Sequence, residues 1–135
     1  MVTGGASGIG QALARRFVTE GAEAVIIADL NGDAVSAVAT EIGAQSFAVD
    51  VRDESAIAAM VAAVEAEFGR IDLFCSNAGI LGVDGAPWWA TGAENDLWQR
   101  MWEIHVMSHV YAARACLPAM IERGEGSVSY THLRA

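Results

Sequence analysis

The chain of 135 residues contains no lysine, and all eight of its basic residues are arginine. Seventeen acidic residues give it a formal net charge of -9. A surface with this excess of negative charge repels a phosphate backbone and an anionic lipid surface, so we expect no nucleic-acid partner and no membrane partner. The lack of lysine also excludes any chemistry that needs a lysine ammonium within these residues.

Cysteine is scarce, and long apolar runs are absent. Cys75 and Cys116 lie far apart without C-x-x-C spacing, so we expect buried, reduced thiols and neither a disulfide nor a metal site. No apolar stretch is long enough to span a bilayer, and the amino end lacks the pattern of a signal peptide. The expected location is therefore the cytoplasm.

Apolar residues are abundant, at 53% of a chain long enough for one domain. Short apolar runs at 1–3, 24–28, 46–49 and 71–75 alternate with helical stripes. The helices are expected to end at Gly21, Gly43 and Gly69, and a fourth helix to run from 94 to 123 with a bend at Pro118. This alternation predicts an α/β fold, a doubly wound parallel sheet with helices on both faces.

A glycine-rich turn leads from the first predicted strand into the first predicted helix. Gly4 can adopt a positive φ angle, Gly8 lets a diphosphate approach the main chain, and Gly10 lets the helix pack tightly against a strand. The N–H groups of the helix that begins near Ile9 can bind phosphate without a basic side chain. The spacing differs from G-x-G-x-x-G, so an ordinary glycine-rich turn is the alternative for this motif alone.

Asp29 ends the second predicted strand, 19 positions after Gly10. A carboxylate at about this distance is expected to accept both hydroxyls of an adenosine ribose and to repel the 2'-phosphate of NADP. Neither Ser7 nor Leu30 supplies a compensating positive charge, so NAD is the predicted cofactor. The alternative is that Asp29 only caps the turn at 31–33.

Four motifs in this order resemble the short-chain dehydrogenase/reductase family, in its classical NAD(P)-dependent branch. They are Thr3-Gly4-x-x-x-Gly8-x-Gly10, Asp29, Asp50-Val51 and Asn77-Ala78-Gly79. The resemblance extends to about residue 128. It implies a truncated, Rossmann-type dinucleotide-binding domain over 1–128, whereas 129–135 look like a non-native tail.

The resemblance also implies where these motifs meet the cofactor. It places Asp50 and Val51 beside the adenine, with the Asp50 carboxylate accepting from the exocyclic amine, and the segment 77–79 beside a ribose of the cofactor. Without the resemblance, Asp50 would simply begin a turn, and 77–79 would form a tight turn. The expected cofactor-binding residues are Gly4, Ser7, Gly8, Ile9, Gly10, Asp29, Leu30, Asp50, Val51, Asn77, Ala78 and Gly79.

His105 stands where the family usually carries an asparagine that holds a water in a proton relay. Histidine can donate and accept hydrogen bonds, so His105 is the candidate catalytic residue, and an inert helix histidine is the alternative. His109 lies one helical turn away, a spacing compatible with a metal. No third ligand stands out, and no metal is expected.

The family's catalytic Ser and Tyr-x-x-x-Lys have no counterpart here. Tyr130 and Arg134 have the spacing, but they follow the fifth strand too closely, and arginine does not replace lysine. We therefore expect an NAD-dependent oxidoreductase that acts on a small alcohol or carbonyl compound, present as an inactive fragment. In the resembled family the helix equivalent to 94–123 forms the dimer face, so the resemblance implies that the full-length protein forms a homo-oligomer, a dimer or a tetramer.

Two other functions remain as alternatives. A non-catalytic dinucleotide-binding protein would bind the cofactor through the glycine-rich turn and Asp29 but would not transfer hydride. A methyltransferase that uses S-adenosylmethionine is more distant, because such proteins usually carry an acidic residue before the glycines, where Val2 and Thr3 stand.

The loop that contains Pro87-Trp88-Trp89 could line a substrate pocket or contact a partner subunit.

Overall fold

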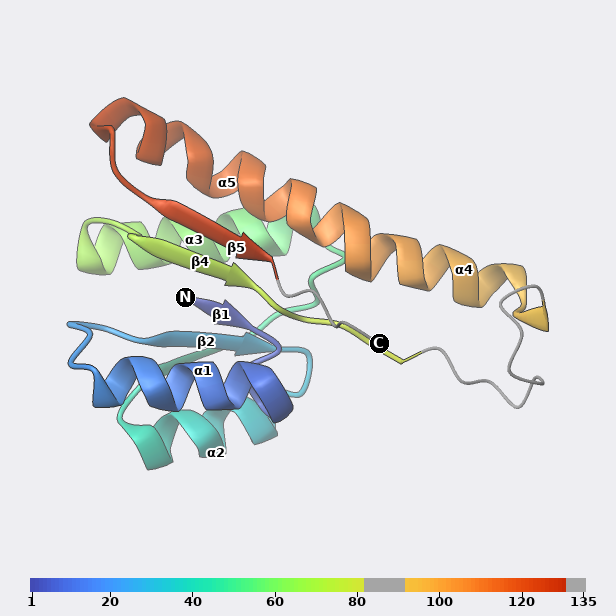
Figure 1. Ribbon diagram of the computed structural model, residues 1–135, viewed down its shortest axis with the longest axis horizontal. Helices are drawn as coiled ribbons and strands as arrows, with labels where there is room; N and C mark the ends of the chain where they lie inside the picture. The colour runs from blue at the N-terminus through green and yellow to red at the C-terminus, as the bar shows by residue number, and fades with distance from the viewer. Residues whose placement is uncertain (82–91, 131–135) are drawn as a thin grey trace.

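A computed structural model describes residues 1–81 and 92–130, without the side chain of Tyr130. Its centre is a five-stranded sheet in which every pairing is parallel and the order is β3-β2-β1-β4-β5. The strands are β1 (Val2–Thr3), β2 (Ile26–Asp29), β3 (Gln45–Ala48), β4 (Leu73–Ser76) and β5 (Ser127–Tyr130). In Figure 1 the arrowheads of β1, β2, β4 and β5 point to the same edge of the sheet. The predicted fold class is confirmed.

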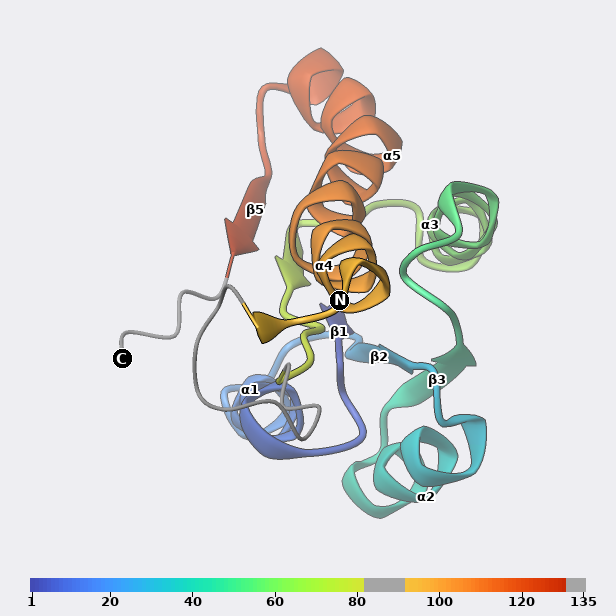
Figure 2. The same cartoon turned by 90° about the vertical axis from the view of Figure 1, so that its right-hand side faces the viewer.

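Helices cover both faces of this sheet. They are α1 (Gly8–Thr19), α2 (Gly32–Ile42), α3 (Glu54–Phe68), α4 (Asn95–Trp102), the π-helical segment η2 (Glu103–Met107) and α5 (Ser108–Arg123). The end-on view in Figure 2 shows α1 and α2 on one face and α3 and α5 on the other. The chain passes from β1 outward to β3 and then returns to place β4 on the other side of β1, so the strand order reverses between β1 and β4. In open α/β sheets, ligands bind in the crevice at such a reversal.

The apolar strand residues divide between two cores. Ile26 and Ala28 pack in the core beneath α3 and α5, whereas Ile27 packs in the core beneath α1 and α2. Phe74 and Cys75 divide in the same way along β4. Successive strand residues point to opposite faces, so a strand buried on both faces must be apolar throughout.

The ends of the helices follow the sequence signals. Beyond α1, Gly21 has a φ of 80°, and the N–H of Ala22 donates to the carbonyl of Phe17 at 3.1 Å, which closes a left-handed cap. Asp53 begins α3 by accepting from the N–H groups of Ser55 and Ala56. These capping interactions determine where each helix begins or ends and therefore where each loop begins.

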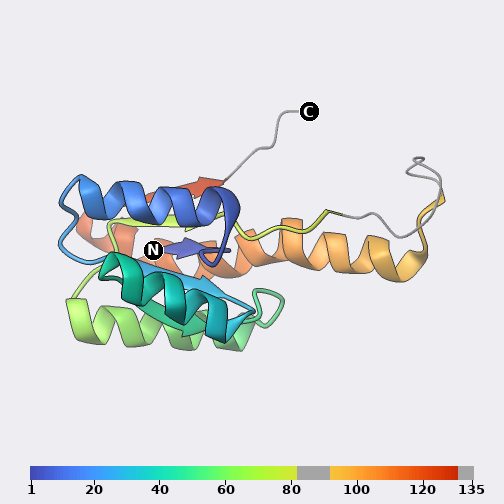
Figure 3. The same cartoon turned by 90° about the horizontal axis from the view of Figure 1, so that it is seen from below.

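The single helix expected over 94–123 is instead three consecutive helical segments. Residues 103–107 form η2 between α4 and α5, and Pro118 lies within α5. Figures 1 and 3 show α4 projecting past the carboxyl ends of the strands. Trp98 and Trp102 of α4 are 54% and 55% exposed in this chain, because α4 extends beyond the sheet that would cover them.

The fifth strand runs past the domain boundary expected at residue 128. Ser129 pairs with Cys75 and Tyr130 with Ser76, so both residues belong to β5. Ladder hydrogen bonds between backbones place these polar residues in the sheet although they lack the expected apolar pattern. Residues 131–135 and the loop 82–91 with its two tryptophans lie outside the described residues. Among the helices described, none has the length and apolar character of a membrane span.

Candidate functional site

Two cavities open at the carboxyl ends of the strands. The first, of about 550 Å³, we call the β2–β3 cavity; its own lining comprises Leu30, Asn31, Val49, Asp50, Val51, Arg52, Arg100 and Ile104. The second, of about 470 Å³, we call the glycine-turn cavity; its own lining comprises Ser7, Gly8, Ile9, Ser76, Asn77, Leu81, His105 and His109. Both are also lined by Gly4, Asp29, Ala78, Gly79 and Ile80. Of the residues expected from the sequence, every one except Gly10 lines at least one of the two.

The glycine turn has the conformation that its glycines were expected to allow. Gly4 has a φ of 69° and Gly8 a φ of 53°, and a Cβ built on Gly8 would meet no atom within 4 Å. The main chain at Gly8 is thus open to the glycine-turn cavity. α1 begins at the same residue, and its N-cap Ser7 makes no side-chain capping bond. The N–H groups of the first turn are therefore not capped by a side chain and can bind an anion.

Gly10 has a different role from the expected packing against a strand. A Cβ there would lie 2.1 Å from the carbonyl oxygen of Gly4 and 2.6 Å from Nδ2 of Asn77. Gly10 therefore lets the helix approach the turn itself. Gly5, which the sequence did not single out, is the glycine that packs on a strand, since its Cβ would lie 2.7 Å from Cβ of Ile27.

Asp29 connects the glycine turn to the end of β2. Its Oδ2 accepts from the N–H of Ala6 and its Oδ1 from the N–H of Asn31, both at 3.1 Å. The second bond is the turn-capping role considered as an alternative. Two fixed donors hold the carboxylate between the two cavities, so capping and ligand binding are compatible.

Thr3 belongs to the glycine motif, but sequence reasoning missed its role in the site. It is only 2% exposed, and its hydroxyl accepts from the N–H of Asn77 at 3.0 Å and from that of Ala78 at 3.1 Å. The Asn77 side chain donates to the carbonyl of Thr3 at 2.9 Å. The segment 77–79 therefore rests against the central strand β1. The available signal was a polar residue at the end of a buried strand.

Asp50 is held by a second missed residue, Arg52. Nε of Arg52 lies 3.0 Å from both carboxylate oxygens, and Nη2 lies 2.6 Å from Oδ2. These hydrogen bonds from the Arg52 guanidinium hold the pKa of Asp50 below its ordinary value. Asp50 also begins a turn, because it accepts from the N–H of Arg52 at 3.0 Å.

His105 lies in the π-helical segment and faces the segment after β4. Its Nε2 is 2.9 Å from the carbonyl oxygen of Ile80, and a Cβ on Gly79 would come within 2.8 Å of its ring. His109 has a separate partner, with Nδ1 2.6 Å from Oγ of Ser76. π-helical turns occur often at functional sites. In the part of the chain that the structure describes, no group of three potential ligands could hold a metal.

Comparison with known proteins decides the family. Residues 1–131 match the family model described as short chain dehydrogenase. The chain belongs to the short-chain dehydrogenase family. It is 40% identical over 129 residues to a 1-deoxy-11-beta-hydroxypentalenate dehydrogenase of Streptomyces exfoliatus, covering 92% of this chain and 46% of that one. It is also 40% identical over 129 residues to a 2-dehydro-3-deoxy-L-rhamnonate dehydrogenase (NAD(+)) of Sphingomonas sp. strain SKA58, covering 95% and 50%. The chain thus spans about half the length of the curated relatives it matches.

Solved structures of the family agree with the fold. A short-chain dehydrogenase from Streptomyces avermitilis superposes with a TM-score of 0.85 at 31% identity, over 96% of this chain and 46% of that one. A metagenomic short-chain oxidoreductase in complex with NADP also gives a TM-score of 0.85, at 32% identity, over 96% and 58%. Members of this dehydrogenase family are therefore similar to the chain in sequence and fold. The name of one relative contains NAD(+), and that of one solved structure contains NADP.

Proposed function

We propose that this chain is the dinucleotide-binding part of an NAD-dependent oxidoreductase, which transfers hydride between nicotinamide and a small alcohol or carbonyl compound. The observation that carries the proposal is the placement of Asp29. Its carboxylate lies between two cavities and is fixed there by the N–H groups of Ala6 and Asn31. One cavity adjoins the uncapped start of α1, which suits a diphosphate, and the other suits an adenosine.

The residues present fit such a cofactor. The first turn of α1 and the open main chain at Gly8 would hold the diphosphate, and Asp29 would accept the ribose hydroxyls. Asp50 and Val51 would contact the adenine, while Ala78 and Gly79 would contact the second ribose. The cofactor supplies the hydride carrier when bound. His105, held at the Ile80 carbonyl, is the residue that we propose to handle a proton nearby.

NAD is the preferred form in this proposal. The Asp29 carboxylate is oriented by two backbone donors, so a 2'-phosphate would meet a fixed negative charge. The Arg52 guanidinium in the β2–β3 cavity is already paired with Asp50. Arg100 lines the same cavity, and it is the side chain that would favour NADP if the preference were reversed.

Calorimetric titration of the 135-residue chain with NAD and NADP tests this proposal. We expect NAD to bind at least about tenfold more tightly than NADP, and Asp29→Asn to reduce that ratio. Asp33→Asn, which removes an exposed carboxylate from the start of α2, is the matched control and should leave the ratio unchanged. A folded chain that releases no heat with NAD, or that binds NADP more tightly, would contradict the proposal.

We propose further that these 135 residues bind the cofactor without turnover, because no lysine is available for the family's Tyr-x-x-x-Lys pair. NADH formation above a protein-free control, with any alcohol, would contradict this. The alternative is a non-catalytic dinucleotide-binding protein. The two hypotheses differ in whether Ser and Tyr-x-x-x-Lys occur in the full-length protein.

A homo-oligomer of the full-length protein is also proposed. It is supported by an open, mainly apolar groove of about 610 Å³ along α5, where Leu117 and Ile121 are exposed. A partner subunit that covered these side chains would remove apolar surface from water. Ile121→Glu should lower the mass measured by light scattering, whereas Glu122→Gln on the same helix should not.

A further inference from the structure

An ion pair at the β2–β3 cavity joins two residues, Asp50 and Arg52, that are only two positions apart. Arg52 folds back over the turn that follows β3, so that its guanidinium and its own N–H both bind Asp50. The pair is partly exposed, with 31% of the Asp50 side chain and 40% of the Arg52 side chain accessible, and both line the cavity. A lone surface carboxylate would sample several rotamers, whereas this one is held in a single orientation.

The geometry leaves the Asp50 carboxylate with limited acceptor capacity. A carboxylate offers about four lone-pair sites. The N–H, Nε and Nη2 of Arg52 occupy about three of them. About one acceptor site remains, which matches a single N–H donor.

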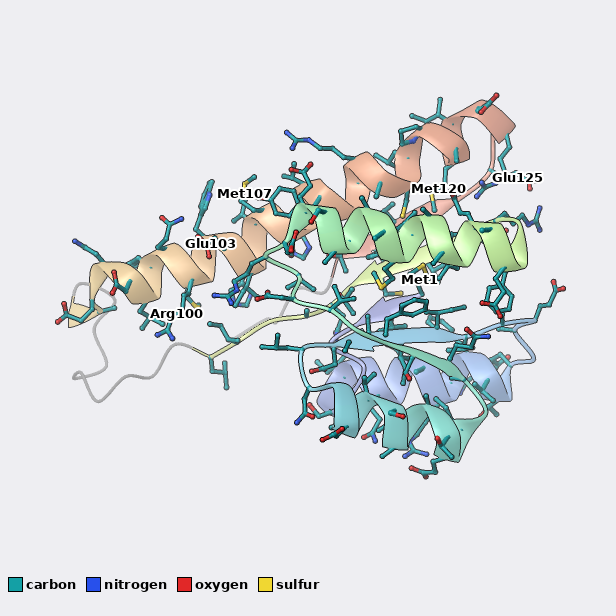
Figure 4. All side chains as sticks on the ribbon, turned by 180° about the vertical axis from the view of Figure 1, so that it is seen from behind. Met1, Arg100, Glu103, Met107, Met120 and Glu125 are labelled. Atoms are coloured by element: carbon teal, nitrogen blue, oxygen red, sulfur yellow. The ribbon has the colours of Figure 1, made fainter. Side chains whose placement is uncertain are left out.

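The surroundings of this site suit a flat, mainly apolar ring. Val49 and Val51 are buried in the wall beside Asp50, and Ile104 lines the cavity from η2. The other charged groups nearby are Asp29, Asp53, Arg100 and Glu103. Figure 4 shows Arg100 and Glu103 one turn apart along the helix that projects past the sheet. The side chains of Val49, Val51 and Ile104 therefore give the cavity apolar walls near the Asp50 carboxylate. Such walls suit an aromatic ring with one polar donor at its edge.

We propose that Arg52 is a positioning residue that orients the Asp50 carboxylate to accept from the exocyclic amine of the adenine, so that the pair selects the base. The inference rests on the proposed dinucleotide binding. It predicts that the Arg52 guanidinium determines how strongly the chain prefers adenine over another base. The affinity for dinucleotides in general should not depend on this guanidinium. Asp50 without Arg52 would keep its charge but lose its fixed direction.

The experiment compares NAD with nicotinamide hypoxanthine dinucleotide, in which a carbonyl replaces the adenine amine. Calorimetry at pH 7 should show the wild-type chain binding NAD about tenfold more tightly, as expected for a hydrogen bond to a charged acceptor. Arg52→Gln and Arg52→Lys should both reduce the ratio to about two- or threefold, since neither side chain has a guanidinium fork. Arg15→Gln breaks an exposed bidentate pair with Glu41 far from the cavity and should leave the ratio at its wild-type value.

The outcomes separate this inference from the function on which it rests. If the folded wild-type chain does not bind NAD, both are overturned. If it binds both dinucleotides equally well, the base-selecting role is overturned while NAD binding stands. If it discriminates but the two Arg52 variants keep the wild-type ratio, or weaken both dinucleotides equally, Arg52 has only a structural role.

Discussion

Asn77 is bound to Thr3 through both its backbone and its side chain, although the two residues are 74 positions apart. The Thr3 hydroxyl also accepts from Ala78 at 3.1 Å. One buried side chain at the end of β1 thus holds the start of the segment that separates the two cavities. The geometry of the candidate site therefore depends on a residue that does not line either cavity.

Thr3→Val should destabilise the protein, because the isosteric side chain leaves two N–H groups of the 77–79 segment without their acceptor. We expect the free energy of unfolding to fall by about 2–4 kcal/mol. Thr3→Ser keeps the hydroxyl acceptor, so its free energy of unfolding should fall by less than about 1.5 kcal/mol. Urea denaturation followed by circular dichroism measures both, and equal losses for the two variants would contradict this account.

Gly10→Ala should reverse the usual effect of this substitution in a helix. Alanine normally stabilises a helix interior by about 1 kcal/mol relative to glycine. Here the new Cβ would meet the Gly4 carbonyl, so we expect a loss of about 2 kcal/mol or more and weakened NAD binding. Gly21→Ala is the control: its surroundings are open, so only the positive φ costs about 1–2 kcal/mol, and binding should not change.

Neither cysteine should react in the folded chain. Burial raises the pKa of Cys116 to about 12 and also raises the pKa of Cys75. The thiolate is the nucleophile, and little of it forms in either side chain at pH 8. Ellman's reagent should detect both thiols only after denaturation. Rapid reaction of either thiol under native conditions would show that the core opens.

Removing Arg52 should move the pKa of Asp50 upward. The guanidinium holds this pKa below its ordinary value, so the pair stabilises the fold above the unfolded-state pKa, and this contribution is lost as the pH falls through the folded-state pKa. In Arg52→Gln, the carboxyl carbon of Asp50 should titrate nearer its ordinary pKa in a carbon-detected NMR experiment. Stability below pH 4 should then depend less steeply on pH. An unchanged titration would mean that another group sets the pKa.

The sequence alone predicted the order of strands and helices along the chain, the parallel sheet and the helix ends at Gly21, Gly43 and Gly69. These features are local, because helical stripes, buried apolar runs and capping residues act over a few positions. Motif spacing also selected residues that prove to share one edge of the sheet. Parallel strands bring their carboxyl ends together whatever lies between them, so Asp29 could be placed there without coordinates.

Tertiary structure alone decided which of those residues touch. The bond from Thr3 to Asn77, the contact of His105 with Gly79 and the packing of Gly5 on Ile27 join segments that are distant in sequence. Strand order and register fix such contacts to within an ångström, and composition and periodicity carry no information at that scale. The position of Arg52 depends on one side chain folding back over its own turn, which only the packed turn determines.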